Sequence, residues 1–99
     1  MEMVKADVVR SLRGRDSGEL FFVLTVDGDY AMIVNGKDRR IEKPKKKKLK
    51  HLAFVERSED RTDQKLRSGD KVTNSELRRA LLAKRQGEEA EGGMHDGER

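Results

Sequence analysis

The four aromatic residues of this chain all lie between positions 21 and 54, and nearly all of its β-branched apolar residues lie between positions 4 and 55. Side chains of these types supply most of the area that a small core buries, so we expect the core within residues 1–57. Only 33% of the 99 residues are hydrophobic, too few for a core that extends over the whole chain. One small domain of limited stability is therefore expected, because such a domain buries only about 60% of its unfolded surface.

Five short segments of this region have the residue types of β-strands. They lie at residues 4–12, 19–26, 30–34, 37–41 and 49–55. Between the third and fourth segments, Asn35 and Gly36 form a pair that favours a type I′ hairpin turn, because both central positions of that turn need positive φ. Five short antiparallel strands with a turn every eight to twelve residues or so predict an all-β fold, a small closed barrel that hides its sheet edges.

The residues after position 57 have a different character. Residues 56–70 are almost wholly polar, with Leu66 as their only large apolar side chain, so residues 58–72 are predicted to be a polar linker or a marginal helix. Thr73 and Glu76 have the spacing of a capping box, which predicts a short helix at residues 73–86 that ends at Gly87. Residues 87–99 are acidic and without periodicity, and we expect them to be disordered.

Positive charge is concentrated in one segment. Residues 37–57 hold ten Lys or Arg against three Asp or Glu, whereas residues 1–36 and 58–99 are each slightly acidic. A surface with this density of cations attracts polyanions and releases their counterions on binding. The run at residues 45–48 is expected to form a loop between two strands of the barrel, where RNA phosphates are its favoured ligand. A solvated charge run or a nuclear-import signal are the alternatives.

Aromatic rings offer a second way to bind RNA, because bases stack on them. Tyr30 or one of Phe21 and Phe22 would serve. In a small barrel with four aromatic residues, however, packing in the core is the favoured role, so we expect recognition of the RNA backbone and shape more than of the bases.

Several other classes of protein are not supported. The chain has no cysteine, which excludes disulfides and thiolate metal sites and fits a reducing compartment. Its longest apolar run, residues 20–26, is far shorter than the ~20 residues that cross a bilayer. Glu2 and Asp7 interrupt any start of the signal-peptide type, so we expect a cytoplasmic protein with no membrane partner.

Catalytic motifs are also missing from the sequence. His51 and His95 are far apart, and Gly14 and Gly18 are not followed by the Lys-Ser/Thr pair of a phosphate-binding loop. No nucleophile elbow occurs. We therefore expect no enzyme activity, no metal and no cofactor.

Residues 14–24, with the loop glycine Gly18 before a mainly apolar strand, resemble a KOW motif. Residues 35–52, which contain Gly-Lys-Asp-Arg-Arg and Lys-Pro-Lys-Lys-Lys-Lys-Leu-Lys-His-Leu, look like the basic segment of bacterial KOW-domain RNA-binding proteins. These are related to KOW proteins of the eukaryotic and archaeal large ribosomal subunit. The similarity covers residues 4–57, and also extends to residues 73–82.

The resemblance implies an SH3-like barrel of the KOW type and a role in translation, with ribosomal or other structured RNA as partner in a ribonucleoprotein. Ribosomal proteins are further possible neighbours, and we expect a monomer when the chain is free. The alternative is a protein-interaction module of the transcription or translation machinery, while a DNA-binding architectural protein is less favoured because no basic recognition helix is present. The expected RNA-binding residues are Arg13, Arg15, Gly18, Lys37, Arg39, Arg40, Lys43, Lys45, Lys46, Lys47, Lys48, Lys50 and His51.

Overall fold

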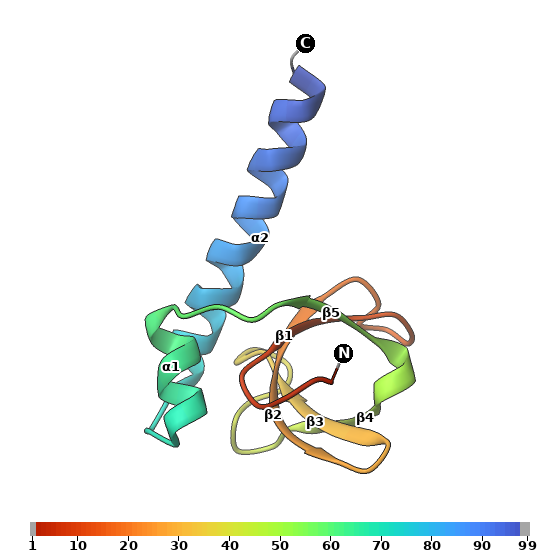
Figure 1. The fold of residues 1–99 in the computed structure, drawn as a ribbon, viewed down its shortest axis with the longest axis vertical. Coiled ribbons are helices and arrows are strands. Elements are labelled where there is room, and N and C mark those ends of the chain that lie inside the picture. Colours follow the sequence, from red (N-terminus) through yellow and green to blue (C-terminus); the bar gives the residue numbers. More distant parts are fainter. Residues whose placement is uncertain (1, 98–99) are drawn as a thin grey trace.

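The computed structural model describes residues 2–97, and the side chains of residues 2–87. The described elements are β1 (Val8–Ser11), β2 (Leu20–Asp27), β3 (Tyr30–Val34), β4 (Lys45–Lys48), the short 3₁₀ helix η1 (Leu49–His51), β5 (Leu52–Glu56), α1 (Arg61–Ser68) and α2 (Asn74–Gly97). The five strands form one antiparallel sheet in the order β4-β3-β2-β1-β5. Figure 1 shows this sheet curling strongly, with α2 extending away from it as a long helix.

The expected closed all-β barrel is wrong: the sheet is open, and with two helices the fold is α+β. In the described part of the chain, β4 and β5 lie at the two edges of the sheet and are not hydrogen-bonded to each other. The reason lies in the connection between them. The three residues of η1 turn the chain sharply, so that β5 pairs with β1 and not with the strand that precedes it.

The strands agree with the sequence in part. β2 and β3 occupy the expected segments, and β1 and β5 are shorter than expected. The segment 37–41, expected as a strand, is a loop instead, because the side-chain Oδ1 of Asn35 accepts hydrogen bonds from the backbone N–H groups of Lys37 and Arg39, both at 2.9 Å. The lysine run at 45–48, expected as a loop, is the edge strand β4.

The sheet has an apolar cluster on each face. The inner, concave face carries Val9, Phe21, Val23, Ala31, Ile33 and Leu52. On the other face, Val8, Phe22 and Val34 pack with helix residues and their neighbours, including Leu66, Val72, Leu77 and Leu81. The expectation that the core ends at residue 57 is therefore wrong, since Leu77 is fully buried. Independent folding of residues 1–57 stays a prediction.

The start of α2 is stabilised by a capping box as well as by the burial of its leucines. At the start of α2, the N–H of Glu76 donates to Thr73 Oγ1 at 3.1 Å and the N–H of Thr73 donates to Glu76 Oε1 at 2.9 Å, which confirms the capping box. Helix α1 lies in the segment expected as a linker or marginal helix. The expected end of the second helix at Gly87 is wrong, because α2 continues to Gly97. The expected disorder of residues 87–99 stays a prediction.

Gly36 explains how closely α2 approaches the sheet. Its φ is +78°, a left-handed conformation that glycine adopts without strain. A Cβ at this position would lie 2.9 Å from the Cβ of Leu77 and still closer to the carbonyl oxygen of Asn74. The glycine that predicted a hairpin turn is thus required by the packing of α2 against the loop after β3.

Candidate nucleic-acid interface

The four lysines of β4 point alternately to the two faces of the sheet, as side chains of a strand must. Lys45 and Lys47 pair with Ile33 and Ala31 of the inner face, and the Lys47 side chain is only 7% exposed. Lys46 and Lys48 point to the opposite face and are exposed. The run therefore exposes two of its four lysine side chains to the solvent.

The inward lysines are held by Asp16, in the loop between β1 and β2. Lys47 Nζ donates to Asp16 Oδ1 at 2.9 Å, to Ser11 Oγ at 2.8 Å and to the carbonyl oxygen of Arg13 at 2.6 Å. Lys45 Nζ lies 3.2 Å from Asp16 Oδ2. Burial alone would raise the pKa of Asp16, but the hydrogen bonds from Lys47, Ser11 and Lys45 outweigh it and lower that pKa to about 2. The carboxylate thus stays charged at neutral pH.

Exposed cations gather where β1, β4 and η1 meet, around His51. The backbone N–H of Leu12 donates to the carbonyl oxygen of His51 at 2.9 Å, which places Arg13 next to this histidine. Partial burial lowers the pKa of His51, and the positive charges of Arg13 and Lys50 lower it further, with Lys48 acting in the same direction. We call Arg13, Lys48, Lys50 and His51 the basic corner.

The cations of the basic corner are not neutralised by ion pairs with other described residues. Among the described residues, the side chains of Arg13, Lys48 and Lys50 make no ion pair or hydrogen bond with the protein. Their charges are therefore available to a ligand, in contrast to that of Lys47. An anion that binds there would meet cations from three different elements.

A second group of expected residues lines a mixed groove of about 220 Å³ on the other side of the β1–β2 loop. Arg15, Arg39 and Lys45 contribute cations to it, but three carboxylates alternate with them: Asp16, Glu19 and Asp38. This groove is close to neutral and attracts a polyanion less than the basic corner does. The remaining expected cations, Lys37, Arg40 and Lys43, are exposed in the loop between β3 and β4.

Gly18 closes the β1–β2 loop with a φ of +91°. Its N–H donates to the carbonyl oxygen of Ser11 at 2.8 Å, and its own carbonyl oxygen accepts from Arg10 Nε at 3.3 Å. A Cβ at Gly18 would meet no other atom within 4 Å. The glycine is exposed and its surroundings are open, so a ligand has room to approach the backbone at this point.

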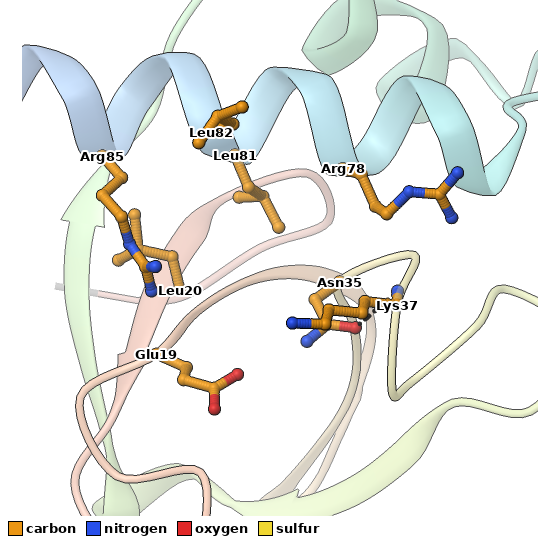
Figure 2. A pocket seen from close by; sticks show the side chains of 8 residues that line it. All are labelled: Glu19, Leu20, Asn35, Lys37, Arg78, Leu81, Leu82 and Arg85. Atoms are coloured by element: carbon orange, nitrogen blue, oxygen red, sulfur yellow. Dashed lines mark hydrogen bonds between the residues drawn. The ribbon is translucent and has the colours of Figure 1, made fainter.

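A larger groove, of about 340 Å³, lies between α2, the start of β2 and the loop after β3 (Figure 2). Leucines of β2 and α2 form its apolar part, and Lys37, Arg78 and Arg85 surround it. Part of the hydrogen-bonding capacity of the Arg78 guanidinium is already used, because its Nη1 donates to the carbonyl oxygen of Gly36 at 2.6 Å. Arg78 and Arg85 were not among the residues expected from the sequence, because the docking of α2 beside the loop after β3 leaves no local pattern.

Sequence reasoning also missed the role of Asp16. The only local signal was an acidic residue between two glycines, a composition that is typical of any surface loop. The described residues contain no group of three or more His, Cys, Asp or Glu that would hold a metal ion. Nor is any helix in residues 2–97 long and apolar enough to cross a membrane.

Comparison with protein-family models found no match, and comparison with curated proteins found no significant relative. The resemblance of residues 14–24 to a KOW motif therefore stays a prediction. What defines the site is its own geometry: an open-sheet α+β module with unpaired cations clustered at one corner.

Proposed function

We propose that this chain is an RNA-binding protein that contacts RNA phosphates through the basic corner. The observation that carries the proposal is the unpaired state of Arg13, Lys48 and Lys50, which lie close enough to His51 to lower its pKa. Phosphate contacts of this kind release counterions and give an affinity that depends on salt. They position a protein on its RNA and read no sequence by themselves.

Structured RNA is the proposed partner, and ribosomal RNA in the cytoplasm is the candidate that the resemblance to KOW proteins implies. The role is one of binding and not of catalysis. In support, the expected cations of the basic corner come from positions 13 and 48–51, and the curled sheet brings them together. The direct biological test is whether the protein sediments with the large ribosomal subunit and remains bound at moderate salt.

One observation favours a second candidate, a protein-interaction module of the transcription or translation machinery. The groove of Figure 2 combines exposed Leu82 and buried Leu81 with the cations of Lys37, Arg78 and Arg85, against the single carboxylate of Glu19. Such a surface suits an acidic peptide with apolar side chains. The basic corner is not part of that groove. Substitutions in the two places therefore separate the candidates.

Competition binding in a salt series tests the proposed function. The full chain is titrated with a fluorescently labelled structured RNA, and unlabelled RNA, duplex DNA and polyglutamate are added as competitors. We expect RNA to compete best and the affinity to fall steeply as salt rises. Equal competition by polyglutamate would favour the protein-interaction module, and an absence of RNA binding at low salt would reject the proposal.

A further inference from the structure

Tyr30 and Phe54 are the two aromatic residues that the sheet leaves partly accessible, and Arg57 lies over the ring of Phe54, 5.6 Å from its centroid. Phe21 and Phe22 are 1% and 0% exposed, whereas Tyr30 is half-buried and belongs to neither apolar cluster of the described residues. The helices pack on Val34, at the opposite end of β3. The expectation that aromatic residues serve mainly the core therefore holds for Phe21 and Phe22 but does not describe Tyr30.

The neighbours of Tyr30 are set by the register of the sheet. Tyr30 pairs with Lys48 on β4 and with Asp27 on β2, so the three side chains lie in a row on the face away from the inner cluster. Lys46 is also on this face, and its Nζ lies 4.6 Å from the centroid of the Tyr30 ring. The Tyr30 ring thus has Lys46 and Lys48 on the side of β4 and the carboxylate of Asp27 on the side of β2.

This row has the chemistry of a nucleotide site. An aromatic face stacks on any base, an ammonium group attracts the phosphate, and a carboxylate accepts hydrogen bonds from a base amino group while repelling phosphate. Lys46 has a flexible four-carbon stem, so it can leave the ring and contact the phosphate of the stacked nucleotide. Lys48 also belongs to the basic corner, which makes the row and the corner one continuous surface.

We infer that Tyr30 stacks on an unpaired base, with Lys46 and Lys48 on the adjacent phosphates, so that the preferred RNA has a single-stranded segment beside its structured part. This inference rests on the proposed function and specifies the RNA further. A base within a duplex is stacked on its neighbours and does not present its face to the protein. Duplex RNA should then bind only through the phosphate contacts of the basic corner.

The chain offers a direct optical test, because Tyr30 is its single tyrosine and it contains no tryptophan. Tyrosine fluorescence therefore reports on this ring alone. The full chain is titrated with single-stranded oligoadenylate of about ten nucleotides, a length typical of single-strand sites. Blunt RNA duplex and inorganic polyphosphate serve as the two controls. We expect oligoadenylate to quench the fluorescence and polyphosphate to bind without quenching it.

Substitution of the ring provides the second measurement. Tyr30→Ala should weaken oligoadenylate binding by roughly 5- to 100-fold, the effect of losing one stacked base, while Tyr30→Phe keeps the affinity of the parent. Oligoadenylate binding without quenching would overturn the inference, and so would an unchanged affinity of a folded Tyr30→Ala variant. If Tyr30→Ala does not fold, the fluorescence result decides. If RNA still binds, those negative results reject the stacking of Tyr30 on a base but not RNA binding through the basic corner. If no RNA binds at all, the proposed RNA-binding function is itself rejected.

Discussion

Lys47 Nζ lies 2.9 Å from Asp16 Oδ1, in a contact that joins the edge strand β4 to the loop between β1 and β2. Both side chains are largely buried, with exposed fractions of 7% and 12%. Because Lys47 also donates to the carbonyl oxygen of Arg13, the contact fixes the loop that carries one cation of the basic corner. A lysine from the middle of the basic run is thus part of the framework that positions the surface around it.

The first prediction separates Lys47 from its neighbour Lys48. Lys47→Met should lower the free energy of unfolding by about 3 kcal/mol, because it leaves Asp16 as a partly buried charge without its main partner. Lys48→Met, at an exposed position of the same strand, should change stability by less than about 0.5 kcal/mol. Urea unfolding measures both. Equal stability of the two variants would show that the Lys47 contact is unimportant in solution.

The second prediction concerns stability in acid. The pKa of Asp16 is about 2 in the folded chain against an ordinary value of 3.8, so the unfolded chain takes up the proton first as the pH falls. The resulting stabilisation, about 2 kcal/mol, is fully present above pH 3.8 and is lost as the pH falls toward 2. Asp16→Asn should therefore be less stable than the parent at pH 6, and the difference should narrow at pH 2. A constant difference across this range would contradict the assignment.

The third prediction concerns the contribution of α2 to the core. Leu77→Ala should lower the free energy of unfolding by about 3 kcal/mol, since Leu77 is fully buried beside residues of the sheet. Leu82, on the same helix, is 53% exposed, and Leu82→Ala is the matched control with an expected change below about 0.5 kcal/mol. If both variants unfold at the same urea concentration as the parent, the sheet is stable without the helix and residues 1–57 form the independent unit.

The fourth prediction links RNA binding to pH through His51. Partial burial and, after it, the nearby cations keep the pKa of His51 below its ordinary value of 6.5, and a phosphate bound at the basic corner would raise that pKa. Binding should then take up a proton, and the affinity should rise as the pH falls below 6.5. His51→Gln should remove this pH dependence, whereas His95→Gln should keep it. A pH dependence that survives in His51→Gln would place the responsible group elsewhere.

The sequence predicted the elements whose signals are local. β2 and β3 follow from aromatic and β-branched runs, and the start of α2 follows from the spacing of Thr73 and Glu76. The lysine run is a strand because it pairs with β3, and no intrinsic preference of lysine predicts that pairing. Likewise, α1 is stabilised by contacts that only the fold creates, among them burial of Leu66 in the core.

The composition of the sequence indicated which segment carries the cations of the candidate site, but not how their side chains are arranged. Residues 37–57 hold most of the expected cations, yet a count of charges does not distinguish Lys47, which is buried, from Lys48, which is exposed. That distinction depends on the register of β4 on β3 and on the contact of Lys47 with Asp16, which lies 31 residues away in the sequence. The grouping of Arg13 with Lys50 depends in turn on the pairing of β1 with β5.

The central claim, that the basic corner holds RNA phosphates, is tested most directly by the salt dependence of RNA binding in two triple variants of equal net charge. One carries Arg13→Ala, Lys48→Ala and Lys50→Ala; the control carries Arg61→Ala, Lys71→Ala and Arg79→Ala, which remove exposed cations elsewhere. We predict that the first variant binds more weakly and that its logarithmic salt slope becomes shallower by about 2 to 3, the value for three lost phosphate contacts. The control should keep nearly the slope of the parent. Equal losses in the two variants, or an unchanged slope in the first, would contradict the claim.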